Sequence, residues 1–450
     1  MLRAVYRRSL KIVLLSVSLF AFNIVAITVQ ASASIIRDTE IEDALLKIMR
    51  PMAKDVGLNP DLMQVRIVIN SQYNAFVMSD NMIYIHSGLI TASENMEEVA
   101  GVLAHEIGHI AAGHIPRRNE VVQSANMASL LTAFAAIALS AAGSGDAAFG
   151  VLAGGMDRSQ RIIMARSRQD EGVADDIAMD LMLKQGLSVE PLAKSMRRIG
   201  AQRSLPESRQ SDYYLTHPAA LERSAIFQDH VNTREDPDFE EPQWMKDAFS
   251  RIKIKLEAWT DPAKTVIRNN IGDYSDAATY KRAIAFHRLS DYKTAAQEMS
   301  FLVKDYPNDP YYQEFLGDIL LKDGRIDTAV VSYKTALSLM EDDLNKGQIN
   351  LSLGRALMLK GDAASLAEAV MILEKAHREE SEWAFVKHQL GIAYGKAGRL
   401  ADADLILAEE ALMLRNHDLA KRLAKRVSGH TDATPIHKQI AQDILNQIDH

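Results

Sequence analysis

The sequence of 450 residues contains no cysteine. This absence excludes disulfide bonds, thiolate metal ligands, a cysteine nucleophile and a lipid-modified N-terminal cysteine. Aromatic residues make up only 6% of the chain, whereas 47% of residues are hydrophobic and 24% are charged. The chain is therefore long enough for two or three domains, and these domains depend on core packing or bound metal for their stability.

Positive charge is also in short supply, because 51 lysines and arginines stand against 59 aspartates and glutamates, for a formal charge of −8. Such a chain lacks an excess of basic side chains to neutralise phosphates. Nucleic acid is therefore not expected as a partner.

The N-terminal segment has the pattern of an export signal. An apolar run over 12–29 is followed by Ala31-Ser32-Ala33, which supplies a small-x-small cleavage site. We therefore expect residues 1–33 to be a signal peptide cleaved near Ala33, and the mature chain to act in the periplasm. An uncleaved membrane anchor is the alternative. The basic residues that precede the apolar run are Arg3, Arg7, Arg8 and Lys11.

A second apolar stretch over 127–142 is rich in alanine and ends at Gly143-Ser144-Gly145. At about 16 residues it is short for a membrane span. We expect a buried or hairpin-forming helix here. Contact with a membrane is the alternative, which leaves a peripheral membrane location open.

The first domain, predicted over 34–260, has a mixed α/β pattern that is mostly helical. Val65–Ile69 alternates at strand period and is followed by strand-like segments over 74–77 and 82–86. Because Ser79-Asp80-Asn81 is a turn signal between the last two segments, we expect a small antiparallel sheet. A helix is predicted from Asn95, which is a good N-cap with Glu98 three residues later.

This predicted helix carries the motif His105-Glu106-Ile107-Gly108-His109. Side chains four residues apart lie on one face of a helix, about 5–6 Å apart at Cβ, which suits two ligands of a tetrahedral zinc ion. Glu106 lies about 100° around the helix, beside the metal, where it can take a proton from the metal's water. Neutral histidines in a core are the alternative.

A third ligand is found by comparing His114 with Glu171. His114 lies about 140° from His109 on a continued helix, so we expect it to be buried or close to the ligands and to point away from the metal. Glu171 lies on a second predicted helix and shares a face with Asp175. A carboxylate ligand with a second carboxylate behind a zinc-bound histidine is a common arrangement. A solvated acidic helix face is the alternative.

The second domain, predicted over 261–450, is helical and repetitive, and an acidic, proline-punctuated linker over 236–242 precedes it. Leu-Gly pairs recur every 37 residues, and a glycine turn follows each pair. The pattern predicts tetratricopeptide repeats that form an all-α superhelix with a concave face for a protein partner. A plain helical cap on the first domain is the alternative. The pairs are Leu316-Gly317, Leu353-Gly354 and Leu390-Gly391, and the turns are Gly324, Gly361 and Gly398.

Three motifs together resemble the gluzincin family of HtpX and the CAAX prenyl endopeptidases, and within it the exported, BepA-like members with C-terminal tetratricopeptide repeats. They are His105-Glu106-Ile107-Gly108-His109 with His114, Glu171-x-x-Ala174-Asp175, and Thr216-His217-Pro218 with Arg223. The resemblance covers the whole mature chain. It departs at Ser79-Asp80-Asn81, where many relatives carry proline and glycine.

The resemblance implies a zincin-type metalloprotease with one Zn²⁺ per chain, held by His105, His109 and Glu171, and with Glu106 as the catalytic base. It also implies that His217 faces the zinc, either to stabilise the oxyanion or to occupy the fourth position in a self-inhibited state. Arg223 matches a residue close to the active site, without a derived role. An extended substrate is expected to add as a strand along Ala75, Phe76 and Val77.

The expected function is that of a zinc metalloendopeptidase that degrades misfolded or stalled envelope and outer-membrane proteins and assists their assembly. Its expected partners are protein substrates and, through the repeats, the outer-membrane assembly machinery. One alternative is a chaperone or assembly factor whose zinc site is mainly self-inhibited. Another is an integral-membrane protease of the HtpX kind, which requires true membrane spans.

Overall fold

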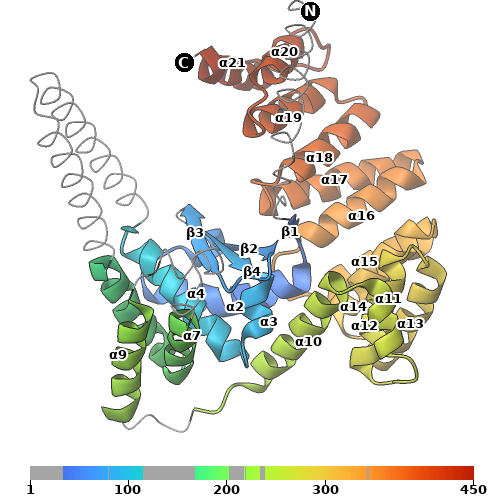
Figure 1. Cartoon of the computed structure of the whole chain (residues 1–450). Helices are drawn as coiled ribbons and strands as arrows, with labels where there is room; N and C mark the ends of the chain where they lie inside the picture. Colours follow the sequence, from blue (N-terminus) through green and yellow to red (C-terminus); the bar gives the residue numbers. More distant parts are fainter. Residues whose placement is uncertain are drawn as a thin grey trace, which may run out of the picture. The chain divides into compact units, whose positions relative to one another are not determined.

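The computed structural model describes residues 34–79, 81–114, 168–201, 217, 219–233, 239–341 and 344–449. The predicted signal peptide and the apolar stretch over 127–142 lie outside these residues. Within the described ranges, none of the helices combines the length and the apolar character needed to cross a membrane. The fold is mostly helical with one small sheet, as expected (Figure 1).

The sheet has the strand order β1-β2-β4-β3. Its strands are β1 (Ser34–Ile36), β2 (Gln64–Ile69), β3 (Ala75–Ser79) and β4 (Met82–His86). The expectation of an antiparallel sheet is wrong, because β2 pairs with β4 in parallel and only β3 pairs with β4 in antiparallel fashion. The physical reason is the connection over 70–74, which carries the chain past the place of β4, so that the hairpin returns β4 beside β2. β3 is left as the last strand at one end of the sheet order.

One face of this sheet packs against helices and forms the core of the first domain. The inward side chains of β2 and β4, such as Ile67 and Ile85, are fully buried together with Leu45 and Met49 of α2 (Thr39–Asp55). Their opposite neighbours along each strand face the other side, as strand alternation requires. The same core takes in apolar side chains of α3 (Ser87–Ala92), α4 (Met96–Ala111), α7 (Glu190–Gly200) and α9 (Ala220–Thr233), and of a helix whose described part covers 168–184.

The helix α4 lies at the centre of this core. It begins as the sequence predicts, because the side chain of Asn95 accepts a hydrogen bond from the backbone N–H of Glu98. The carboxylate of Glu98 reaches back to the backbone N–H of Glu94 at 2.6 Å, one residue before the expected partner. Nearly every residue of α4 is buried, since the helix contacts α2, α7, β3 and α10 (Gln243–Thr260). A rigid, buried helix thus carries the histidine motif.

Helical hairpins follow α10, as the repeat pattern predicts. The three Leu-Gly pairs lie on the first helices of hairpins, and their glycines allow close helix packing: a Cβ added at Gly317 would lie 2.7 Å from the ring of Tyr333. A further hairpin, over 276–305, precedes the first Leu-Gly pair. The helices are α11 (Ala263–Asn269), α12 (Asp276–Arg288), α13 (Tyr292–Asp305), α14 (Pro310–Lys322), α15 (Ile326–Leu339), α16 (Gly347–Lys360), α17 (Ala363–Glu379), α18 (Ala384–Lys396), α19 (Leu400–Met413), α20 (His417–Val427) and α21 (Pro435–Asp449).

The predicted domain boundary at residue 260 coincides with the end of α10. Phe249 and Leu256 of this helix belong to the core of the first domain, whereas Ala258 belongs to the core of the first hairpins. Additional links between the two regions are polar and largely buried: Arg37 binds Glu380 at 2.7 Å, and the hydroxyl of Thr39 donates to Glu314 at 2.6 Å. The boundary itself stays a prediction.

Candidate metal centre

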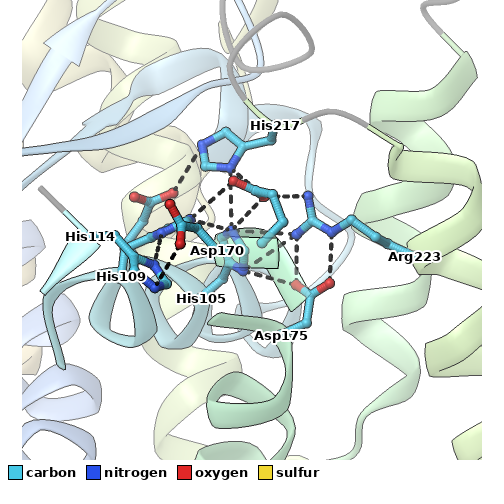
Figure 2. Close-up of polar contacts among 9 residues, drawn as sticks. His105, His109, His114, Asp170, Asp175, His217 and Arg223 are labelled. Atoms are coloured by element: carbon cyan, nitrogen blue, oxygen red, sulfur yellow. Dashed lines mark hydrogen bonds and ion pairs between the residues drawn. The ribbon is translucent and has the colours of Figure 1, made fainter. Parts of the chain in front are cut away.

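Two histidines of α4 point to the same place, as helical spacing requires. The Nε2 atoms of His105 and His109 lie 3.1 Å apart, and the two rings are at 86° to one another. His105 is fully buried and His109 is 9% exposed. Figure 2 shows both rings on one side of the helix.

Glu171 comes from the 168–184 helix and reaches both histidines. Its Oε2 lies 3.4 Å from Nε2 of His105, and its Oε1 lies 3.4 Å from Nε2 of His109. Gly108 permits this approach, since a Cβ added there would lie 2.7 Å from the backbone carbonyl oxygen of Ala174. The glycine inside the motif is therefore part of the site, a role that sequence reasoning missed although the residue stood between the two ligands.

His217 completes a group of four donors with His105, His109 and Glu171. One ligand atom from each residue lies within 4.8 Å of all the others. Nδ1 of His217 is 2.9 Å from Oε2 of Glu171 and 3.3 Å from Nε2 of His105. These four side chains come from α4, the 168–184 helix and the segment ahead of α9. The sequence had indicated His217 only by resemblance, and its neighbours Thr216 and Pro218 lie outside the described residues.

The donor spacing suits zinc. Four ligands at about 2.0–2.1 Å from one ion in a tetrahedron lie roughly 3.3 Å from each other. Five separations between atoms of these residues, from 2.9 to 3.4 Å, are close to this value, and one ligand atom from each residue lies within 4.8 Å of all the others. Imidazole nitrogen and carboxylate oxygen are also ordinary zinc ligands. The residues present therefore fit a zinc ion.

Asp175 and Arg223 lie behind the donors. Oδ1 of Asp175 is 3.0 Å from Nδ1 of His105, the ring nitrogen that faces away from the group. Arg223 on α9 donates to both oxygens of Asp175, and its Nη1 donates to Oε2 of Glu171 at 2.6 Å. These contacts fix the orientation of one histidine and one carboxylate of the group. They also give Arg223 a structural role that sequence reasoning did not derive.

The buried charges shift the pKa values of the group in opposite directions. Burial raises the pKa of Glu171, but the charge of His217 and hydrogen bonds with the histidines outweigh it and hold this pKa well below its usual range. Burial lowers the pKa of His109 to about 3. Burial acts in the same direction on His105, yet its hydrogen bonds with Asp175 and Glu171 prevail and raise the pKa to about 9. An ionised carboxylate and a neutral His109 are protonation states that a metal requires, whereas His105, with its raised pKa, would have to lose a proton when a metal binds.

His114 is buried beside the group and takes no part in it, as expected. Its Nδ1 lies 2.9 Å from Nδ1 of His109, and its Nε2 lies 3.6 Å from Oδ1 of Asp170. The helical angle that motivated the expectation does not apply, because α4 ends at Ala111 and Gly113 turns the chain at a φ of 65°. His114 is therefore buried beside the ligands as expected, although it lies on a turn after α4 and not on a continued helix. The contact of Asp170 with His114 was not predicted from the sequence. The position of Asp170 directly before Glu171 was the only sequence feature that could have indicated it.

Glu106 lies beside the donors rather than among them. It is 2% exposed, and its Oε1 is 3.8 Å from Nε2 of His217. A carboxylate beside the donors would be placed to take a proton from a water if the group held a metal. This is the placement that the 100° helical offset predicts.

The predicted substrate strand is β3, next to α4. Ala75, Phe76 and Val77 pair with Ile85, Tyr84 and Ile83 of β4, and α4 contacts β3 on the core side. Among the described residues, no further strand pairs with β3. The histidine helix and the terminal strand of the sheet are therefore neighbours.

Comparison with known proteins agrees with this arrangement. Residues 39–229 match peptidase family M48. The metalloprotease LoiP of Escherichia coli (strain K12) is 27% identical over 202 residues, which are 43% of this chain and 72% of that protein. The metalloprotease YcaL of the same organism is 29% identical over 190 residues, which are 42% of this chain and 68% of that protein.

The similarity to a third relative extends into the repeats. The β-barrel assembly-enhancing protease of Escherichia coli (strain K12) is 22% identical over 311 residues, which cover 67% of this chain but only 61% of that protein. Among solved structures, a tetratricopeptide-repeat protein of Thermus thermophilus is 17% identical over 38% of this chain and 100% of its own, with a TM-score of 0.26. Residues 39–229 are therefore similar to peptidase family M48, and the chain is a metalloprotease in which helical hairpins follow this region.

Proposed function

We propose that this protein is a zinc-dependent endopeptidase of the periplasm that degrades misfolded or stalled envelope proteins and assists the assembly of outer-membrane proteins. The observation that carries the proposal is the convergence of His105, His109 and Glu171 at ligand spacing, with Glu106 beside them. The donor set and the placement of a carboxylate next to it are those of metal-assisted peptide hydrolysis.

One Zn²⁺ per chain is proposed, with His105, His109 and Glu171 as its ligands. When bound, the ion polarises the scissile carbonyl and lowers the pKa of the attacking water. Asp175 accepts a hydrogen bond from the far ring nitrogen of His105 and so holds the other nitrogen toward the ion. Arg223 keeps the carboxylates of Glu171 and Asp175 in place.

Glu106 is the proposed proton carrier. It is buried and 3.8 Å from Nε2 of His217, close enough to the donor group to receive a proton from the attacking water. It then returns this proton to the nitrogen of the leaving amine. A single carboxylate can serve as base and then as acid because the two steps follow each other at the same face of the peptide.

His217 is the proposed regulator of this site. In one state its ring donates to the developing oxyanion of the substrate. In a second state it occupies the fourth ligand position and closes the site. Its 2.9 Å approach to Glu171 and 3.3 Å approach to His105 support the closed arrangement as the resting one.

The substrate is proposed to bind as an extended strand on β3, along Ala75, Phe76 and Val77. An added strand makes main-chain hydrogen bonds that do not depend on sequence. This mode suits a protease whose clients share an unfolded state rather than a sequence. Since α4 contacts β3, the added strand lies next to the helix that carries Glu106.

The clients and partners are proposed from the relatives and the repeats. One relative is named a β-barrel assembly-enhancing protease, but the similarity spans less than two thirds of its length. Helical hairpins of this kind offer a concave face to a protein partner, so we propose outer-membrane assembly machinery as a partner of 261–450. The curated relatives that match are named as proteases, which favours hydrolysis over a purely chaperone role.

The Glu106→Gln protein tests the proposal. It should bind one zinc per chain, measured by elemental analysis after dialysis, yet fail to cleave labelled casein. The matched control is Glu97→Gln, which alters another buried glutamate of the same helix and should leave cleavage intact. Cleavage of casein by the Glu106→Gln protein at the wild-type rate would contradict the assignment.

A further inference from the structure

The two faces of β3 differ in chemistry. Ala75 is buried and Val77 packs against the core, because both point toward the helices. Phe76 points to the opposite face and is only half-buried. Alternation along a strand requires this division. The outward face of the terminal strand therefore presents an aromatic ring.

Phe76 continues a row of side chains that crosses the sheet. It pairs with Tyr84 on β4, and the two rings are stacked, with centroids 5.2 Å apart and planes 9° apart. Tyr84 in turn pairs with Arg66 on β2, and Glu42 holds that guanidinium at 3.2 Å. The ring of His86 meets Phe76 edge-on at 5.9 Å. The row is thus fixed at its inner end and ends at Phe76 on the outer strand.

A strand added to β3 would place its own side chain in this row. Neighbouring strands lie about 4.8 Å apart, and directly opposite side chains approach to about 4.5–5.5 Å. This is the spacing that already separates Phe76 from Tyr84. A ring on the added strand, opposite Phe76, would therefore extend the existing stack by one member.

We propose that Phe76 and Tyr84 form a subsite that selects an aromatic or large apolar side chain of the bound substrate strand. This subsite rests on the proposed function and adds a substrate class to it. The class is polypeptide segments with large apolar side chains on alternate residues. Residues between these positions point toward α4 and its metal ligands. The main-chain bonds of the added strand give binding, and the aromatic row adds preference.

The test is a guest-residue scan with synthetic peptides. A peptide of extended, uncharged sequence carries one guest residue (Phe, Leu, Ala or Asp) that is moved along it in single steps. Binding to the zinc-loaded Glu106→Gln protein is measured by fluorescence anisotropy, so that cleavage is not needed. We expect Phe to bind about three- to tenfold more tightly than Ala, and only at alternate positions, because every second residue of a strand faces Phe76.

Variants of Phe76 test whether the preference for Phe over Ala guest residues comes from the row of side chains that ends at Phe76. In the Glu106→Gln background, Phe76→Ala should abolish the difference between Phe and Ala guests while retaining binding of the Ala peptide. If the Phe76→Ala protein folds poorly, Phe76→Leu is used in its place, because leucine keeps the apolar packing. This variant is expected to lower the preference for Phe guests. The control is Phe301→Ala, which removes an exposed ring in the repeats and should change nothing. A flat scan, or a preference that survives Phe76→Ala, overturns the proposal.

The two proposals fail separately. If the wild-type protein cleaves no substrate but the variant binds Phe guests with a period of two, the proposed catalysis is wrong and the subsite stands. If the wild-type protein cleaves casein and the guest scan is flat, the subsite is wrong and the catalysis stands.

Discussion

Arg223 donates to both carboxylate oxygens of Asp175, with Nε to Oδ2 at 2.7 Å and Nη2 to Oδ1 at 2.6 Å. Two parallel hydrogen bonds of this kind fix both distance and plane. The pair is buried, since Arg223 is 5% and Asp175 is 4% exposed. Because Asp175 also contacts Nδ1 of His105, the orientation of the first proposed ligand depends on a residue of α9 that is distant in the sequence.

Removal of the carboxylate charge behind His105 should weaken metal binding. In the Asp175→Asn protein the ring loses its charged acceptor, and the loss of such a partner lowers metal affinity by about 10- to 100-fold. Zinc affinity is measured by competition with a chromogenic chelator. Asp176→Asn is the matched control, because Asp176 is the next residue along and is exposed. Equal affinities for the two variants would show that Asp175 does not orient the ligand.

Loss of the guanidinium should destabilise the apo protein more than the zinc-bound one. Arg223→Gln leaves Asp175 and Glu171 buried with one less positive charge, and breaking a buried ion pair costs about 3–5 kcal/mol. Bound zinc restores positive charge next to Glu171, so the deficit should shrink when zinc is added. Unfolding by urea, with and without zinc, measures both free energies. Arg197→Gln, at an exposed position on α7, should show neither effect.

The smallest substitution that should disrupt the site is Gly108→Ala. A Cβ at this position would lie 2.7 Å from the carbonyl oxygen of Ala174, a backbone atom that cannot move aside without displacing its helix. We expect Glu171 to shift from the histidines and zinc affinity to fall by at least tenfold, roughly the loss of one well-placed ligand partner. Gly172→Ala is the control, because nothing lies within 4 Å of its added Cβ. Unchanged zinc affinity in the Gly108→Ala protein would contradict this view of the helix contact.

Much of this site could be predicted because its parts are local in sequence. Helical spacing alone brings His105 and His109 together, and Asn95 fixes where their helix begins. The contact of Gly108 with Ala174 could not be predicted, since it depends on how two helices far apart in the sequence cross. The expectation of an antiparallel sheet was wrong for a similar reason: alternation identifies strands, but it does not say which strand a short connection passes over.

The repeats were predictable in outline for a different reason. Leu-Gly pairs and turn glycines repeat the same hairpin, and each hairpin contacts its neighbours mainly, so local pattern and fold coincide. The buried polar contacts between the first domain and the repeats have no such periodicity. The hydroxyl of Tyr311 on α14 donates to Asp43 of α2 at 3.2 Å. The two residues are 268 positions apart, and no sequence pattern predicts that they meet.

The burial of Asp43 predicts a pH-dependent stability. Burial raises the pKa of Asp43 to about 8, and the nearby Glu42 acts in the same direction, while Tyr311, Arg50 and the backbone of Asn345 oppose the rise. The folded chain therefore holds a proton on this carboxyl that the unfolded chain releases near its ordinary pKa of 3.8. The stabilising contribution is complete below about pH 4 and is lost as the pH rises toward about 8.

Asp43→Asn removes this dependence while it keeps an oxygen that can accept from Tyr311. We expect the variant to match the wild-type protein near pH 4 and to exceed it near pH 8.5, by at least about 1 kcal/mol, since each pKa unit of difference corresponds to about 1.4 kcal/mol. The free energy of urea unfolding is compared at both pH values, with Asp305→Asn as an exposed control. If the Asp43→Asn protein were instead less stable than the wild type at the higher pH, the ionised carboxyl would have to stabilise the fold, and its folded-state pKa could not be raised by burial.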